Sequence, residues 1–133
     1  MITLIPNLGR EWALERIPKM QAWMGEAKSL AAVERFQTLG VVVFDAFTPH
    51  DCCAHIVIED RRCVTRRILR AVFDYPFNQL KLRRVTGLVP ESNVAALAFD
   101  LRLGFKVEGR KKWGMGDEDE IVLGMYAENC PWL

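Results

Sequence analysis

The chain has 133 residues, half of them apolar and 26% charged, a balance typical of a folded soluble domain and not of a disordered, collagen-like or coiled-coil protein. Eighteen Lys and Arg residues against 17 Asp and Glu leave a net charge of +1, so no overall field attracts nucleic acid or an anionic membrane. No apolar run approaches the roughly 20 residues of a membrane-spanning helix, and residues 1–8 lack the basic start and cleavage site of a signal peptide. We therefore expect a single domain over residues 1–133, located in the cytoplasm, with its cysteines as free thiols.

Turn signals and two kinds of apolar periodicity predict a mixed α/β chain without internal repeats or linkers. The predicted elements, in chain order, are a strand over 1–5, a helix over 10–24, strands over 30–36, 39–47 and 51–59, a helix from 64 that ends before 80, a strand over 82–89, a helix over 94–103, and strands over 105–113 and 120–126. Proline should break or bend the first helix at Pro18 and distort the last turn of the second at Pro76, because it lacks an amide hydrogen. The element order is therefore β-α-β-β-β-α-β-α-β-β.

Local signals define several of the boundaries. Gln37-Thr38 is the expected turn between the second and third strands. Ser92 or Asn93 can accept the first free amides of the third helix, and Gly104 is its natural C-terminal stop. In the strand over 51–59, alternation assigns Asp51, Cys53, His55, Val57 and Glu59 to one face and Cys52, Ala54, Ile56 and Ile58 to the other.

The second half of the chain carries a motif that extends from the strand over 82–89 to residue 109. It consists of that strand, the segment 90–93 with its asparagine at Asn93, and the sequence LGFKVEG at 103–109. This combination resembles the strand, asparagine and LGFK-x-EG sequence of the GNAT superfamily of N-acetyltransferases, whose element order also matches. The closing residues 130–133, among others, resemble the branch of the family that phages and prophages often carry.

The resemblance implies an α/β fold with a mixed, mostly antiparallel twisted sheet flanked by helices. It also implies acetyl-CoA as co-substrate and transfer of its acetyl group to an amine of a small molecule or a protein. The acidic segment 117–120 could attract a cationic amine. C-terminal strands in this fold commonly pair across a homodimer, and a phage-encoded protein would act in the cytoplasm of its bacterial host.

In this family a loop that opens the helix after the third strand of the sheet's first half holds the pyrophosphate of the cofactor. The candidate residues there are Arg61, Arg62, Val64, Thr65 and Arg66. Cys63 and Thr65 stand where the family has small residues, so their side chains either point away or narrow the site. A solvated helix face is the alternative role for the arginines. Nucleic-acid binding is a further alternative, but the acidic segment and the lack of interleaved aromatic residues argue against it.

By the same resemblance, the acetyl thioester lies between two strands that diverge. Ile56, Val57 and Ile58 should line that gap. Asn93 matches the asparagine that touches the pantetheine arm, or it serves only as an ordinary helix cap.

Two residues are candidates for proton transfer. Asp100 occupies the position of the tyrosine that usually protonates the leaving thiolate, and helical spacing places it on one stripe with Asn93. An aspartate needs a raised pKa for that role, and a solvated helix aspartate is the alternative. His55 is the leading candidate for the base that deprotonates the amine, the alternative being a half-buried histidine bonded to a neighbouring strand.

Two rival readings come from other classes of site. A zinc site would use His50, Cys52, Cys53, His55 and Cys63. We expect no metal, because adjacent strand residues face opposite ways and the spacing matches no known zinc motif. The stronger rival is a catalytically weak or inactive GNAT-like module that binds acyl-CoA or a protein partner, since Cys63, Thr65 and Asp100 depart from the family pattern.

Overall fold

The computed structural model describes residues 1–133 and contains one seven-stranded sheet with the strand order β1-β2-β3-β4-β5-β7-β6. Its strands are β1 (Thr3–Pro6), β2 (Lys28–Glu34), β3 (Gln37–Asp45), β4 (Cys53–Ile58), β5 (Arg84–Pro90), β6 (Lys106–Lys111) and β7 (Glu120–Tyr126), and its α-helices are α1 (Arg10–Arg16), α2 (Arg66–Asp74) and α3 (Val94–Leu103). Only β4 and β5 pair in parallel, so the predicted mixed, mostly antiparallel sheet and the element order are confirmed. None of the helices combines the length and hydropathy that crossing a bilayer requires.

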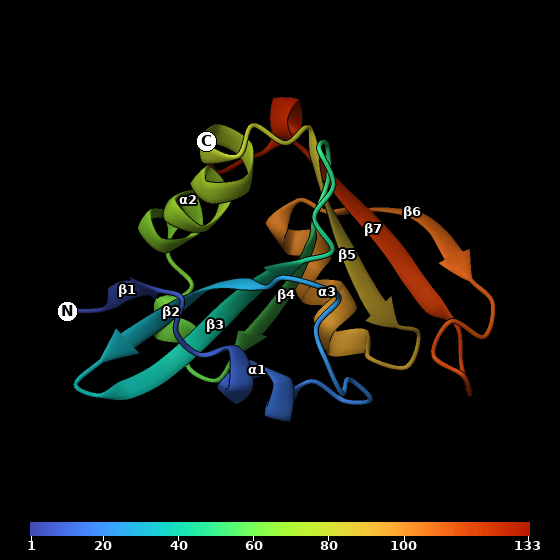
Figure 1. Cartoon of the computed structure of the whole chain (residues 1–133), viewed down its shortest axis with the longest axis horizontal. Helices are drawn as coiled ribbons and strands as arrows, with labels where there is room; N and C mark the ends of the chain where they lie inside the picture. Colours follow the sequence, from blue (N-terminus) through green and yellow to red (C-terminus); the bar gives the residue numbers. More distant parts are fainter.

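The sheet is divided between β4 and β5. The two strands pair only at Cys53 and Thr86, where the Thr86 amide donates to the Cys52 carbonyl at 2.8 Å, and they then diverge toward their C-terminal ends (Figure 1). Every second residue of a strand directs its backbone polar groups to the same side. The N–H and C=O groups of Ile56 on β4 and Leu88 on β5 therefore face the gap without a strand partner.

Helices cover both faces of the sheet. On β3, Val42 and Phe44 pack into the main core, which α2 and α3 cover, whereas Val41 and Val43 pack against Ala13 of α1 on the other face. The apolar stripe of α2 consists of Ile68, Leu69, Val72 and Phe73, all buried. Each such side chain contributes roughly 1.5–3 kcal/mol by leaving water, so this stripe holds α2 against the sheet.

The first helix is shorter than predicted. α1 ends at Arg16, and Ile17 is extended (φ −96°, ψ 114°) because the residue before a proline is disfavoured in the helical region. Pro18 thus breaks the helix as predicted, but the expectation of helix as far as residue 24 is wrong. Pro76 lies in a π-helical turn (Tyr75–Gln79) that follows α2, which confirms the predicted distortion.

The turn between β2 and β3 lies earlier than predicted. Glu34 pairs with Gln37, so the turn is formed by Arg35 and Phe36, whose φ angles are 51° and 67°. Two successive residues in the left-handed region match the twist of a two-residue hairpin. The predicted turn at Gln37-Thr38 is wrong because Arg and Phe carry none of the turn preference of Asn or Gly, so nothing in their residue types marked the position.

Candidate functional site

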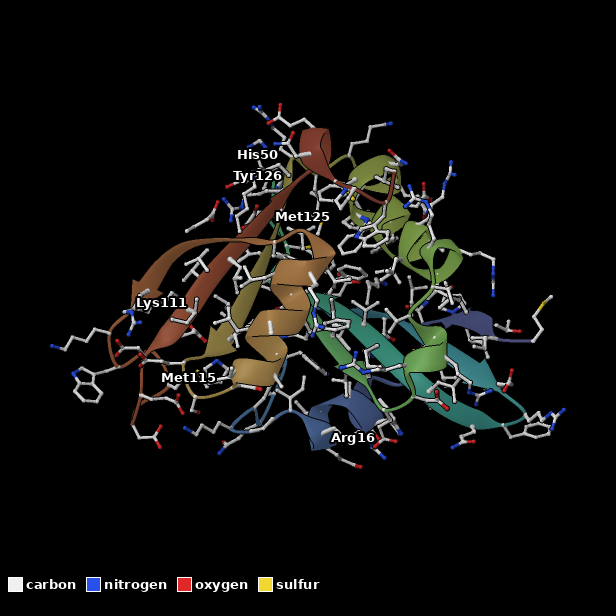
Figure 2. The ribbon with its side chains drawn as sticks, turned by 180° about the vertical axis from the view of Figure 1, so that it is seen from behind. Arg16, His50, Lys111, Met115, Met125 and Tyr126 are labelled. Atoms are coloured by element: carbon white, nitrogen blue, oxygen red, sulfur yellow. The ribbon has the colours of Figure 1, made fainter.

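The gap between β4 and β5 is a cleft of about 350 Å³. Residues 95–100 of α3 line it on one side, and residues 16–18, at the C-terminal end of α1, line it on another. Figure 2 shows Arg16 below the first turn of α3. The predicted site residues that line the cleft are His55, Ile56, Val57, Ile58, Arg61, Asn93 and Asp100. The structure therefore brings together side chains from two separate segments of the sequence, 55–61 and 93–100.

Asn93 caps α3 and faces the cleft. Its Oδ1 accepts a hydrogen bond from the Ala96 amide at 3.2 Å, and the helix ends at Gly104, whose φ of 116° suits glycine. The predicted bounds of this helix are confirmed. Because capping uses only the oxygen of Asn93, its side-chain NH₂ group is free to donate into the cleft.

Cys63 does not narrow the turn that precedes α2. Its side chain is 2% exposed and packs beside Ala32 and Leu39, and its thiol lies 3.1 Å from the Asp60 carbonyl oxygen. Of the two alternatives left by the sequence, the side chain points away. Thr65 is the N-cap of α2, its Oγ1 accepting from the Ile68 amide at 3.2 Å, which leaves its hydroxyl hydrogen free to donate.

Few backbone amides are free at the start of α2. The amides of Cys63, Val64 and Thr65 donate to carbonyl oxygens within the same turn, and the Val64 side chain packs against the core. The amides of Arg66 and Arg67 have no acceptor in the protein. An anion here would meet two amides, the Thr65 hydroxyl and the positive end of the helix dipole.

The three arginines of this turn differ in their partners. Arg62 donates to Glu34 Oε1 at 2.7 Å and to Asp60 Oδ2 at 3.0 Å, and these two carboxylates raise its pKa above the ordinary value. Arg61 lines the cleft, and the guanidinium of Arg66 lies 5.8 Å from the centre of the Trp132 ring. Arg61 and Arg66 are thus available to a negatively charged group, whereas Arg62 is already bound to Asp60 and the β2–β3 hairpin.

Asp100 projects from α3 into the cleft with its carboxyl group over Gly87 of β5, where a Cβ atom would lie 3.7 Å from Oδ2. Burial raises its pKa to about 6, because desolvation disfavours the charged form and no hydrogen-bond donor compensates it. At pH 7 about a tenth of the molecules then carry the neutral acid at this position. The raised pKa that the sequence argument required is therefore present.

His55 is held by a buried carboxylate that sequence reasoning missed. Its Nε2 lies 2.7 Å from Oδ1 of Asp45, a residue of β3 that is only 1% exposed and whose other oxygen accepts from the Met24 amide at 2.8 Å. A carboxylate only accepts, so Nε2 carries a hydrogen and, in the neutral ring, Nδ1 is the basic nitrogen. A charged residue ending the apolar run 39–44 was the available signal.

The carboxylates around the mouth of the cleft are largely paired. Arg16 donates to Glu59 at 2.7 Å, while Lys19 bridges Asp117 and Glu118, at 2.7 Å each. Lys19 and the donors of residue 92 lower the pKa of Glu118 to about 2. The pairing of Asp117 and Glu118 with Lys19 thus holds the loop 117–120 against the chain after α1. It also neutralises part of the negative charge of this loop, which weakens the prediction that the loop attracts a cationic amine.

Cys53, the first residue of β4, and Cys52, which precedes it, lie on opposite faces of the sheet, as strand alternation predicts. Burial raises the pKa of Cys52 to about 12 and that of Cys53 to about 11, so both thiols stay protonated at neutral pH and are poor metal ligands. No group of three or more His, Cys, Asp or Glu side chains is placed to hold a metal ion.

Comparison with solved structures identifies the fold. No protein-family model matches the chain, and no curated protein matches it in sequence. A mutant of the spermidine N-acetyltransferase SpeG from Vibrio cholerae superposes with a TM-score of 0.79 at 14% identity, covering 96% of this chain and 94% of that one. The chain has the GNAT fold.

Other solved structures agree with this assignment of the GNAT fold. A GNAT family acetyltransferase from Elizabethkingia anophelis with acetyl-CoA bound gives a TM-score of 0.77 at 13% identity, covering 94% of this chain and 97% of that chain. The N-acetyltransferase PseH from Campylobacter jejuni, in complex with acetyl coenzyme A, gives 0.58 at 18% identity over 77% of this chain and 69% of that one. These likenesses establish the architecture, and the activity has to be argued from the residues of the cleft.

Proposed function

We propose that the protein is an N-acetyltransferase that transfers the acetyl group of acetyl-CoA to a primary amine. The observation that carries the proposal is the divergence of β4 and β5, which leaves backbone donors and acceptors of Ile56 and Leu88 facing a cleft next to the start of α2. The pantetheine arm of acetyl-CoA is a chain of amides and fits a strand edge of this kind. Structures of the same fold with acetyl-CoA bound support the assignment.

The pyrophosphate of acetyl-CoA fits the start of α2. The free amides of Arg66 and Arg67 and the hydroxyl of Thr65 would hold it, with the side chains of Arg61 and Arg66 adding positive charge. The NH₂ group of Asn93 would donate to the pantetheine arm from the start of α3. Arg62 has no place in this site because its guanidinium is bound to Asp60 and Glu34.

Two residues of the cleft can move the protons that acetyl transfer requires. As the amine nitrogen attacks the thioester carbonyl carbon, Nδ1 of His55 would take a proton from that nitrogen, while Asp45 holds the ring and balances its charge. When the carbon–sulfur bond breaks, the neutral carboxyl group of Asp100 would give its proton to the leaving sulfur. His55 gains one proton and Asp100 loses one, so the number of protons on the protein is unchanged. Exchange with solvent then restores the starting protonation state of both groups.

A small-molecule amine is the acceptor that the comparisons favour, because the most similar structures include spermidine N-acetyltransferases. An amine on a protein is the alternative. A homodimer, a cytoplasmic location and the phage-type branch remain predictions from the sequence.

A second candidate function is binding of acyl-CoA without transfer. Two observations favour it: Asp100 stands in the cleft at the position where the family has a tyrosine, and the amides of Cys63, Val64 and Thr65 in the turn that precedes α2 already donate to carbonyl oxygens of the protein. Binding is expected under both functions, whereas release of CoA in the presence of an amine is expected only under the first.

Calorimetric titration with acetyl-CoA, CoA and desulfo-CoA tests the site directly. We expect micromolar binding that an Arg61→Ala, Arg66→Ala double variant loses and that Arg62→Ala retains, because Arg62 is an arginine of the same turn with its charge already paired. A thiol-release assay with a panel of amines then separates the two functions. Absence of binding at millimolar acetyl-CoA would refute both.

A further inference from the structure

A second hollow lies outside the cleft. It measures about 700 Å³ and is lined by residues of α2 and of the first three strands of the sheet. None of its lining residues lines the cleft between β4 and β5. A helix on a sheet is normally close-packed against it, so a hollow of this size, within the range of small-molecule sites, needs an explanation.

One stripe of α2 and the turn after it forms the wall of the hollow. The residues Arg67, Arg70, Ala71, Asp74 and Tyr75 follow the spacing of one helix face and all line it. This stripe runs beside the apolar stripe that holds α2 to the core. It presents charged and aromatic groups, so the hollow has a polar wall and an apolar floor that includes Leu30 and Phe44.

The charge of the lining is positive. Lys28, Arg67 and Arg70 supply three cations against the single carboxylate of Asp74, and of the three only Lys28 is ion-paired, with Glu26 at 3.0 Å. That carboxylate already accepts from the side-chain amides of Asn78 and Gln79, at 2.8 and 2.9 Å, which lower its pKa. Arg70 forms no ion pair in the protein, and Arg67 uses one guanidinium nitrogen on the Ile2 carbonyl at 3.0 Å.

The aromatic groups of the lining also point to a ligand. The rings of Phe44 and Tyr75 are tilted against each other with centroids 5.4 Å apart, and both line the hollow. Tyr75 is half-buried, and its hydroxyl has no hydrogen-bond partner in the protein, so it is free to donate. It stands at the beginning of the π-helical turn Tyr75–Gln79, and such turns occur frequently at functional sites.

From this lining we infer that the hollow is a second ligand site, which binds a small aromatic carboxylate. The ring of the ligand would lie on Leu30 and beside the Tyr75 ring, above the buried Phe44, and its carboxylate would accept from the guanidinium groups of Arg67 and Arg70 and from the Tyr75 hydroxyl. The hollow shares no lining residue with the cleft, and Arg67 is the one residue common to the two proposed sites: its backbone amide faces the pyrophosphate and its guanidinium faces the hollow.

A matched pair of probes tests the charge requirement on the unaltered protein. The ¹⁵N-labelled full chain is titrated with 2-naphthoate and, separately, with the neutral 2-naphthalenemethanol, and amide shifts are followed by NMR. We expect naphthoate to bind at least about tenfold more tightly, the effect of one charge-assisted hydrogen bond, with shifts centred on Leu30 and Ala71. Equal affinities, no binding at millimolar naphthoate, or shifts centred on Ile56 and Asn93 of the cleft would overturn the proposal.

A substitution of Arg70 tests whether this arginine binds the carboxylate of the ligand. Arg70→Gln should weaken naphthoate binding about tenfold and leave the alcohol unaffected, because Arg70 is exposed and forms no ion pair or hydrogen bond in the protein. Arg102→Gln, which removes an exposed arginine from α3 outside the hollow, should change neither affinity. Saturating acetyl-CoA should also leave naphthoate binding unchanged. An Arg70→Gln protein that binds naphthoate as tightly as the unaltered chain would refute the assignment.

Discussion

The buried pair of His55 and Asp45 offers a sharp test, because a single atom changes its chemistry. Asp45→Asn keeps the shape of the side chain but replaces one acceptor oxygen by a donor NH₂ group. If the remaining oxygen continues to accept from the Met24 amide, the NH₂ group faces Nε2 of His55 at 2.7 Å in the present structure. Two donors cannot face each other, so the ring must move its hydrogen to Nδ1, and the nitrogen that we propose as the base is then no longer basic.

The magnitude follows from the burial of Asp45. At 1% exposure water cannot take part, so a charge-assisted hydrogen bond is exchanged for a neutral one between the new NH₂ group and Nε2, and the variant should lose about 1–2 kcal/mol of unfolding free energy in urea denaturation. Turnover should fall about 10²- to 10⁴-fold, the usual contribution of a general base. Long-range ¹H–¹⁵N NMR of the imidazole reads the tautomer directly, with the hydrogen on Nε2 in the unaltered protein and on Nδ1 in the variant.

Asp51→Asn is the matched control. Asp51 accepts from the Thr86 hydroxyl at 2.9 Å and is partly exposed, so its substitution should affect stability less and leave the His55 tautomer unchanged. If Asp45→Asn lowers stability but leaves both the tautomer and the turnover unchanged, the pair has a purely structural role and the proposed base is wrong.

Three further predictions concern the helix ends and the cleft. Asp100→Asn should lower turnover with little change in acetyl-CoA affinity. It should also stabilise the protein at pH 8 by at most about 3 kcal/mol but not at pH 4, because a folded-state pKa of about 6 costs stability only as the pH rises above the pKa of the unfolded chain. Equal stabilisation at both pH values would show that burial of the charged carboxylate is not the cause. Thr65→Ala should cost about 1 kcal/mol in urea denaturation by removing the cap on the Ile68 amide, and Thr65→Ser should restore it; a fully stable alanine variant would contradict the capping role. Gly104→Ala should cost roughly 1–3 kcal/mol, since its φ is 116° and the new Cβ atom would lie 2.9 Å from Pro131; a thermal midpoint equal to that of the unaltered chain would show that both constraints relax.

Much of the fold could be predicted from the sequence because the signals are local. The bounds of α3 follow from Asn93 and Gly104, the break after Arg16 from Pro18, and the faces of β4 from simple alternation. Each of these depends on residues within a few positions along the chain, so a single sequence contains the information. The turn at Arg35 and Phe36 was the exception, since neither residue type favours the left-handed conformation that the strand pairing imposes.

Tertiary structure decided which side chains of the site are free to bind a ligand or to transfer a proton. Arg62 was indistinguishable in the sequence from Arg66, and only the folded chain places Glu34 next to it. In the same way, the partner of His55 is Asp45 on the adjacent strand, and the pKa of Asp100 is set by burial. The sequence by itself determined which residues lie on one helix or strand face, because periodicity is local; which charges are paired, buried or free was determined only by packing, because their partners come from distant segments.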